Sequence, residues 1–458
     1  MEHERLFAEM ICGEAPAFID AEVARAARHL ADLVGVMLAA AGEPSVKAVA
    51  ALFQSAGGET NSARIVGTAR RLSVRDAGLV NAYASHWHDF DNDETDITMA
   101  HLTATTMTAA AVIADSRPGI SGAEVLEAYL IGTEVAMVIA RLINPGHYLR
   151  GWHSSATLGT FAACAAAGRL LGLDPKAMRS ALGTAASLAS GIRSNFGTHT
   201  KPLQVGQAVA NGIFAAECAA AGLESQEGSL FGPTGYVAMQ EGDLSWVEAT
   251  IRRFGKPYGF SAGGMIIKAY PCCTAPHSAI WGLLELLRAH AVVGPDIERI
   301  VCDIDPGVAG ILMYDDPQTA VEAKFSLPYS LAAAAVFGRV GISEFTDTAV
   351  RNPAVRDMMG RVDTVYVSDL PKGPSGIAVS SRVALVLRDG RRFEKFCEAI
   401  PGSDRNPMND EALRAKFVAC TANVLSETQA NKLFARLLAS PACEDFSSLV
   451  DGYIPAVS

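Results

Sequence analysis

The segment from His86 to His101, HWHDFDNDETDITMAH, concentrates side chains that can exchange protons. It contains three histidines and five acidic residues, and the apolar run Leu102–Ala114 follows it directly. Ionisable groups next to a segment that must be buried are unfavourable unless they are paired or bind something. The segment therefore predicts either a solvated acidic loop that caps a helix or a site for acid–base chemistry, which needs partners from elsewhere in the chain.

Two metal hypotheses arise from the same segment. They concern two overlapping sets of side chains, Asp89, Asp91 and Asp93 or His86, His88 and Asp89. The first set has the spacing of a calcium-binding EF-hand loop, but such a loop requires Gly at its sixth position and Glu at its twelfth. Here those positions are Glu94 and Ala100, so the calcium hypothesis fails. The second set stays open as a transition-metal alternative because histidine is a common ligand. We expect no metal at this site.

Composition restricts the class of protein. A chain of 458 residues is too long for one hydrophobic core, so two or more domains are expected. Half of the residues are hydrophobic and 19% are charged, which is typical of a well-packed globular protein. The net charge of −11, without any block of Lys or Arg, argues against a nucleic-acid partner.

The cysteines and the N-terminal residues predict a compartment. The nine cysteines are scattered and form no C-x-x-C pair, which is typical of the reducing cytoplasm. The first residues, MEHERLFAEM, are polar and unlike a signal peptide. No apolar run reaches the roughly 18 residues that would cross a bilayer. We expect a cytoplasmic protein with no membrane partner.

Hydrophobic periodicity predicts helices over most of the first 260 residues. Val23, Ala27, Leu30 and Val34 recur at helical spacing, and Ser73 is placed to cap the helix that runs into the acidic segment. Further helices are predicted at Met99–Ala114, Gly122–Leu142, Ser154–Leu171, Lys176–Ala189 and Gln207–Ala221. Two of them have faces of small residues, which indicates a closely packed, buried bundle.

The pattern changes after about residue 260. Alternating, β-branched segments predict strands at Ile297–Asp305, Val362–Ser368, Ala378–Leu387 and Arg392–Ala399. Asp389-Gly390 between the last two is a hairpin signal. Helices are predicted among the strands at His277–His290 and Pro328–Phe337, and after Pro401 at Asp410–Leu425 and Glu427–Leu438.

These elements predict a mainly α fold. A large all-α helical domain is built from both chain ends, residues 1–264 and 401–458, and a smaller α+β lid domain, residues 265–400, is inserted between them. The cleft between the domains is the default place for a site.

Nucleotide-binding motifs and the zinc-protease motif are absent from the sequence: there is no P-loop, Rossmann glycine pattern or H-E-x-x-H. Four other segments place His, Lys or Tyr beside Gly or Pro near helix starts, at residues 146–159, 195–206, 268–277 and 323–330. Together with the acidic segment they exceed what helix caps require. Arg150 and Arg193 lie in or beside them and are candidates to clamp a substrate carboxylate.

The five segments, in this order, resemble the MmgE/PrpD family, which includes 2-methylcitrate dehydratase, cis-aconitate decarboxylase and iminodisuccinate epimerase. The strings GWHSSATLG, NFGTHTKP and EAKFSLPYS are specific to it, and the resemblance extends to PGSDRNPMND near the end of the chain. It implies an all-helical domain with a smaller α+β lid, a homodimer, and no required metal or organic cofactor.

The resemblance also implies site residues. The family's catalytic positions correspond to Asp89, His101, His153, Lys201, Lys268 and Tyr329. Asp93 stands where related enzymes often have Thr, and Cys273 where the decarboxylases carry His, so both are expected to contact the substrate. These departures leave the substrate open, and they predict little or no decarboxylation of cis-aconitate. Cys273 is either a small filler or, with a lowered pKa, a base.

Family substrates are di- or tricarboxylates that lose or move a proton next to a carboxylate. The resulting carbanion needs positive charge in a water-poor cleft, which lysines and histidines supply. We therefore expect a cofactor-independent lyase of the dehydratase or decarboxylase type acting on a small anionic carboxylate. An epimerase of a dicarboxylate such as iminodisuccinate is the alternative within enzymes, and a non-catalytic carboxylate-binding or dimeric scaffold protein is the alternative outside them. Neither Lys201 nor Lys268 lies on an apolar stripe, so the fold is expected to survive the loss of either.

Overall fold

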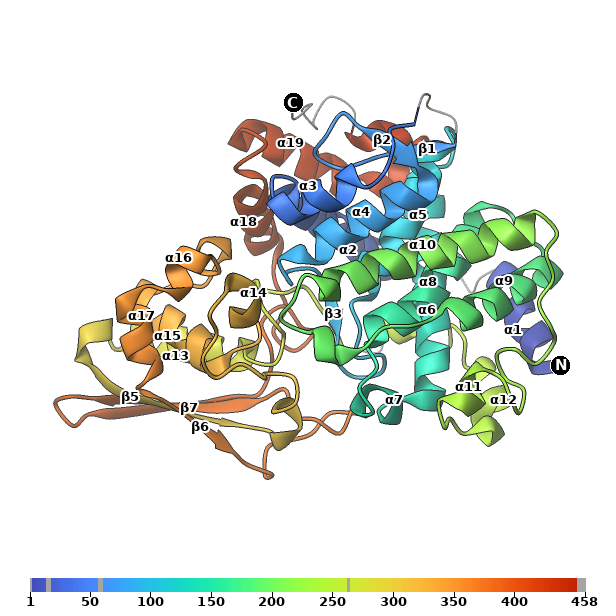
Figure 1. Ribbon diagram of the computed structural model, residues 1–458. Helices are drawn as coiled ribbons and strands as arrows, with labels where there is room; N and C mark the ends of the chain where they lie inside the picture. The colour runs from blue at the N-terminus through green and yellow to red at the C-terminus, as the bar shows by residue number, and fades with distance from the viewer. Residues whose placement is uncertain (1, 14–17, 57–60, 262–263, 451–458) are drawn as a thin grey trace.

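The computed structural model describes residues 2–13, 18–56, 61–261 and 264–450. The fold is mainly helical, as predicted, with one four-stranded sheet that lies to one side of the helices (Figure 1). The C-terminal helices return to the helical part, where they pack beside a helix from the first 40 residues.

The centre of the helical part is a bundle of long, largely buried helices. Its members are α2 (Asp20–Ala40), α4 (Val74–Trp87), α6 (Gly122–Ile143), α8 (Ser154–Leu170) and α10 (Thr200–Ala220). Glycines on the small-residue faces allow close packing: a Cβ added at Gly212 of α10 would lie 2.7 Å from the carbonyl oxygen of Thr160 on α8. The small faces seen in the sequence are therefore contacts between buried helices.

Shorter helices surround this bundle. They are α1 (Glu2–Cys12), α3 (Pro44–Ala51), α5 (Thr108–Ser116), α7 (Gly146–Leu149), α9 (Pro175–Leu188), α11 (Tyr236–Met239) and α12 (Val247–Ile251). The C-terminal helices α18 (Asp410–Thr421) and α19 (Glu427–Leu438) pack against α2. A buried ion pair of 2.7 Å between Lys416 and Asp32 joins the two chain ends. The C-terminal helices therefore contact the helical bundle, while the division of the chain into domains stays a prediction.

The sheet contains β5 (Ile297–Ile304), β6 (Val362–Tyr366), β7 (Ser381–Leu387) and β8 (Arg392–Cys397). Its order is β6-β5-β7-β8; β5 and β6 are parallel, and the other neighbours are antiparallel. The turn at Asp389-Gly390 joins β7 to β8, and Gly390 has the positive φ that favours glycine. The helices of this part are α13 (His277–Ala289), α14 (Ala320–Ala323), α15 (Leu327–Phe337), α16 (Asp347–Val350) and α17 (Pro353–Met359).

Residues from Tyr270 to Leu387 form a hydrophobic core separate from that of the helical part. The proposed domain boundaries at 264 and 401 stay a prediction. Some element boundaries were wrong: α10 begins at Thr200 rather than Gln207, and the helix expected from Met99 begins with a π-helical turn, η1 (Thr103–Met107), that leads into α5. Two short pairs of strands complete the secondary structure, β1 (Ser62–Arg64) with β2 (Arg71–Ser73) and β3 (Asp93–Glu94) with β4 (Met265–Ile266).

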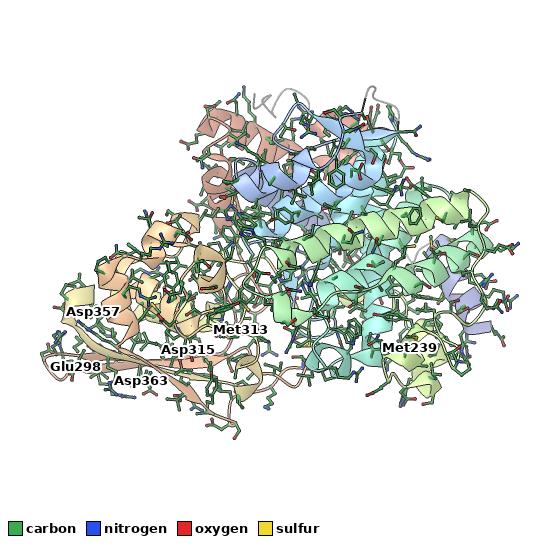
Figure 2. All side chains as sticks on the ribbon, viewed as in Figure 1. Met239, Glu298, Met313, Asp315, Asp357 and Asp363 are labelled. Carbon is green, nitrogen blue, oxygen red and sulfur yellow. The ribbon has the colours of Figure 1, made fainter. Side chains whose placement is uncertain are left out.

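Within the described ranges, no single helix is both long and apolar enough to cross a membrane; α2 and α3 meet the length and composition test only together, bent by 91°. Many acidic side chains lie on the surface of the protein. Figure 2 shows Glu298, Asp357 and Asp363 at the outer edge of the α+β part.

Candidate active site

A cavity that is partly open to solvent lies where the two hydrophobic cores meet, the kind of place where small-molecule sites are common. One wall, here called the polar wall, comes from the helical part and contains Asp89, Asp93, His101, His153 and Lys201. The opposite wall, here called the apolar wall, comes from the α+β part and contains Val308, Ile311, Ile377, Ala378 and Val379. The cavity therefore combines ionisable groups with a surface that excludes water.

The acidic segment is shaped by its backbone. α4 ends at Trp87, and Asp89 has a φ of 51°, in the left-handed region that Asp tolerates better than most residues. The next residues form β3, in which Asp93 pairs with Ile266 of β4. This pairing brings the segment next to Lys268, which is distant in the sequence. Strained backbone conformations of this kind cluster at functional sites.

Asp89 is held between two lysines. Nζ of Lys201 donates a hydrogen bond of 2.8 Å to Oδ2 of Asp89, and Nζ of Lys268 donates to Oδ1. Burial alone would raise the pKa of Asp89, but the charges of the two lysines hold that pKa well below its usual range. The predicted cationic cluster therefore includes a negative charge, because both lysines bind the carboxylate of Asp89.

Lys268 differs from the expected role because it does not line the cavity. Its side chain has no exposed surface, and Nζ also donates to the carbonyl oxygens of Asp89 at 3.1 Å and Cys272 at 3.0 Å. The structure thus places Lys268 behind Asp89, where it fixes the carboxylate from the interior. Because it is fully buried and paired, the expectation that the fold tolerates its loss is not supported.

His153 faces the cavity as a neutral base. Its Nδ1 lies 2.7 Å from Oε1 of Gln204, an oxygen that only accepts, so Nδ1 carries the hydrogen and Nε2 is left with its lone pair. Within the described part of the chain, that buried Nε2 has no hydrogen-bond partner. Burial, together with the charge of Lys201, holds the pKa of His153 well below its usual range. His153 is therefore unprotonated near neutral pH and able to accept a proton.

His101 lies beside the two aspartates of the polar wall. Its backbone N–H donates to Oγ of Ser155 at 3.0 Å, which anchors the residue against α8. Its Nε2 is 3.8 Å from Oδ1 of Asp89 and 3.8 Å from Oδ1 of Asp93. His101 is thus placed to hold or deliver a proton at the edge of the cavity.

Asp93 and Cys273, the two positions that depart from the family pattern, both line the cavity. Asp93 accepts hydrogen bonds from the hydroxyl of Thr274 and the backbone N–H of Glu94. Burial raises its pKa, but His101, Lys268 and the Thr274 hydroxyl lower it more, so Asp93 is ionised. Burial raises the pKa of the Cys273 thiol to about 11, with a further contribution from Asp89. The neutral thiol fits a filler, and the geometry gives no support to Cys273 as a base.

Besides Lys268, three expected residues lie outside the cavity lining. Tyr329 is in the core of the α+β part, where its hydroxyl donates to the carbonyl oxygen of Glu344, so it is not presented to the cavity. Arg150 forms a 3.0 Å ion pair with Glu241 instead of facing the site. Arg193 stacks on the ring of Tyr148, with its guanidinium carbon 4.2 Å from the ring centre, and lies one layer behind the cavity.

Two residues of the site were not predicted from the sequence. Tyr148 lines the cavity directly. Lys324 is buried and lines a small side cavity together with Asp89 and Lys201. Its Nζ donates to the carbonyl oxygen of Trp87 at 2.6 Å, and burial lowers its pKa to about 8 despite Asp89. The signal for Lys324 was present, since it is the charged residue of the string AKFSLPYS, whereas Tyr148 had no distinguishing pattern.

The transition-metal set His86, His88 and Asp89 is not assembled. Nε2 of His88 lies 3.6 Å from Glu43 on another side of the segment. Ligand atoms of His86, Asp91 and His101 do lie within 4.8 Å of one another. These distances arise because the carboxylate of Asp91 lies between the imidazoles of His86 and His101.

Comparison with known proteins identifies the family. The MmgE/PrpD N-terminal domain matches residues 5–247, and the MmgE/PrpD C-terminal domain matches residues 270–439. The chain belongs to the MmgE/PrpD family, which confirms the assignment made from its motifs.

The curated relatives that it resembles include cis-aconitate decarboxylases. The chain is 28% identical to the one from Homo sapiens over 363 residues, covering 78% of this chain and 74% of the relative. It is 27% identical to the one from Mus musculus over 395 residues, covering 83% and 78%. It is 24% identical to the one from Aspergillus terreus over 412 residues, covering 85% and 83%.

Proposed function

We propose that this protein is a lyase of the dehydratase or decarboxylase type that acts on a small di- or tricarboxylate through removal or delivery of a proton next to a carboxylate. The observation that carries the proposal is the unpartnered, neutral Nε2 of His153 in the same cavity as Lys201. A base and a cation in one water-poor cavity are what such a proton transfer requires. The names of the relatives support the same class of reaction.

In this proposal each polar group has one task. The ammonium of Lys201 attracts a substrate carboxylate and neutralises the negative charge that develops on it as the α-proton leaves. Nε2 of His153 accepts that proton, and His101 holds a proton for the opposite side of the reaction. Asp89, fixed by Lys268, keeps Lys201 in place.

The apolar wall strengthens these interactions. Val308, Ile311 and Ile377 offer no hydrogen bonds to water, so the charges of the polar wall act in a medium of low polarity. A substrate that fills the cavity displaces the remaining water from between the walls. The two walls together favour an anion that becomes more charged at its carboxylate oxygens during the reaction.

The substrate panel that tests the proposal contains citrate, 2-methylcitrate, cis-aconitate, malate, tartrate and iminodisuccinate. Products are followed by carbon NMR, and released carbon dioxide is trapped and counted. Loss of water or carbon dioxide from at least one compound, abolished in His153→Ala, is the expected result. Inversion of a stereocentre without loss of either would instead establish an epimerase, and binding without any conversion would establish a non-catalytic protein.

A further inference from the structure

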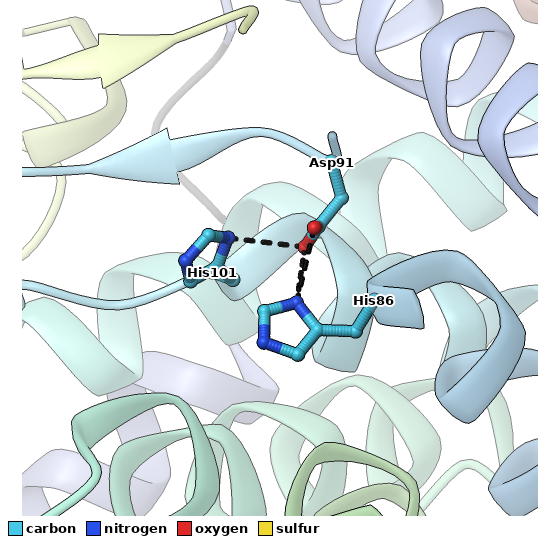
Figure 3. Close-up of side chains that lie close together, drawn as sticks. All are labelled: His86, Asp91 and His101. Atoms are coloured by element: carbon cyan, nitrogen blue, oxygen red, sulfur yellow. Dashed lines mark hydrogen bonds and ion pairs between the residues drawn. The ribbon is translucent and has the colours of Figure 1, made fainter. Parts of the chain in front are cut away.

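Three buried side chains, one of which is His101 of the polar wall, lie close together (Figure 3). It consists of His86 on the last turn of α4, Asp91 in the loop after it, and His101 itself. Asp91 has no exposed surface and does not line the cavity. The mechanism above gives no task to Asp91 or His86, although burying a carboxylate is unfavourable unless it serves its partners.

The contacts place Asp91 between the two rings. Nδ1 of His86 is 3.0 Å from both carboxylate oxygens of Asp91. Nδ1 of His101 is 3.1 Å from Oδ2 of Asp91, as an ion-pair contact. Burial raises the pKa of Asp91, but His86 and His101 hold that pKa well below its usual range, so the group is a carboxylate. The His86 contact has hydrogen-bond geometry, whereas Nδ1 of His101 lies at ion-pair distance from Asp91 and makes no hydrogen bond among the described residues. Because a carboxylate only accepts, the nitrogen of each ring that faces it is expected to carry hydrogen.

This arrangement decides which atom of His101 meets the substrate. When Nδ1 carries the hydrogen that faces Asp91, Nε2 is the atom left to take or release a proton, and Nε2 is on the side of Asp89 and Asp93. Burial lowers the pKa of His86 to about 4, so His86 stays neutral and does not cancel the charge of Asp91. The whole charge of Asp91 remains available to a protonated His101.

We propose that Asp91 is a positioning residue of this site, which fixes His101 with its hydrogen on Nδ1 and stabilises the imidazolium formed when Nε2 takes a proton, while His86 holds Asp91 in place. The catalytic part of this inference rests on the proposed function. The tautomer assigned to His101 does not, because it follows from the contacts of Asp91 alone. An aspartate that orients a catalytic histidine in this way contributes up to about 10⁴-fold to turnover in other enzymes.

Other charged groups act on His101 as well. The groups around it are Asp89 and Asp93 on the side of Nε2, Asp91 and His86 on the side of Nδ1, Lys201 and Lys268 beyond Asp89, and His153 across the polar wall. Changing Asp91 alone leaves the other charged groups in place, so a change in the pH dependence of turnover reports on Asp91.

A metal ion shared by the three side chains is the rival explanation. A metal would bind the lone pair of Nδ1 on each ring, which must then carry no hydrogen. The two explanations thus predict opposite states of Nδ1, and a nitrogen NMR spectrum of histidine-labelled, purified protein distinguishes them before any substrate is known.

The experiment combines that spectrum with kinetics of Asp91→Asn. Asp96→Asn is the matched control, because Asp96 lies in the same segment but does not line the cavity. We expect His101 to carry hydrogen on Nδ1 in the native protein and to show a mixture of tautomers in Asp91→Asn. We also expect kcat to fall by about 10²-fold or more, KM to change by only a few-fold, and the alkaline limb of the kcat profile, where the proton held by His101 is lost, to move to lower pH. The control should behave as native.

The inference is overturned if Nδ1 of His101 carries no hydrogen in the native protein, or if a bound metal is found that Asp91→Asn releases. Unchanged kcat and an unchanged pH profile in a folded Asp91→Asn protein overturn it too. If the variant does not fold, the spectrum of the native protein still decides the tautomer. Failure of every carboxylate to react would refute the proposed function but leave the tautomer result standing.

Discussion

The two walls of the cavity are built by different rules. The polar wall comes from a 16-residue segment and two helix starts, and its groups are fixed by ion pairs and hydrogen bonds such as those of Asp89. The apolar wall comes from the inserted α+β part and offers Val308, Ile311 and Ile377, which only pack. The comparison teaches that reactivity resides on one side of the site and exclusion of water on the other. Changes on the polar wall should therefore affect turnover most.

The largest effect is expected at Lys201, the cation of the polar wall. Lys201→Met removes the charge that stabilises the developing anion, so kcat/KM should fall by at least about 10²-fold. The measurement is steady-state kinetics with the best compound of the substrate panel. Lys432→Met is the control, because Lys432 is an exposed lysine on α19. Near-native kinetics in Lys201→Met would remove this residue from the mechanism.

Lys268 tests whether support from behind the polar wall is as important as contact with the cavity. Lys268→Met leaves Asp89 buried with one lysine instead of two, which should lower the free energy of unfolding by about 3 kcal/mol, as breaking a buried pair does. Turnover should fall by a factor of about 10² as well, since Asp89 is no longer fixed. Urea denaturation and kinetics are measured on the same preparation. A variant with native stability and native turnover would show that Lys268 supports neither the fold nor the position of Asp89.

Lys324 reports whether water reaches the interior beside the polar wall. Its pKa is lowered from 10.5 to about 8 in the folded protein, so folding disfavours its charged form. Below pH 8 this penalty is fully present, and it disappears as the pH rises from about 8 to 10.5. Relative to Lys324→Met, the native protein should therefore gain stability between pH 7 and pH 9.5. Equal changes in the unfolding free energies of both proteins would mean that Lys324 is solvated.

The smallest effect is expected at Cys273, on the side of the α+β part. Because burial raises its pKa to about 11, the thiol is neutral near pH 7 and Cys273→Ser should change turnover only a few-fold. A loss of about 10²-fold would instead assign it the role of a base. The native protein should also release little or no carbon dioxide from cis-aconitate. Rapid release would show that the departure at Cys273 does not alter the substrate, in agreement with the names of the relatives.

Much of this arrangement could be predicted from the sequence because periodicity and motif strings are local. Helical spacing predicted α2, α6, α8 and both C-terminal helices, and the hairpin at Asp389-Gly390 predicted the pairing of β7 with β8. Six of the ten predicted site residues line the cavity: five of them are on the polar wall, and the sixth, Cys273, lies beside the apolar wall.

The direction of individual side chains could not be predicted in this way. Whether Lys268 faces the cavity or the interior depends on the left-handed turn at Asp89 and on the pairing of β3 with β4, which are long-range features. Tyr329 follows a motif lysine closely, yet α15 turns it into the core of the α+β part, and Lys324 is the residue of that motif that reaches Asp89 and Lys201. The spacing of residues in the sequence identified the segments that form the site, but the three-dimensional packing decides which side chains of those segments face it.

The measurement that tests the central claim most directly is proton exchange at the α-carbon. The native protein and Lys201→Met are incubated with the best panel compound in deuterated water, and deuterium is followed by NMR in the product and in the recovered substrate. If the reaction is loss of carbon dioxide, the product is expected to carry solvent deuterium next to its carboxylate; if it is loss of water, a substrate deuterated at the α-carbon is expected to react with a primary isotope effect. In either case Lys201→Met should form product about 10²-fold more slowly. A decarboxylation product without solvent deuterium at that carbon, or loss of water with neither exchange nor an isotope effect, would contradict the assignment of α-proton chemistry to the polar wall.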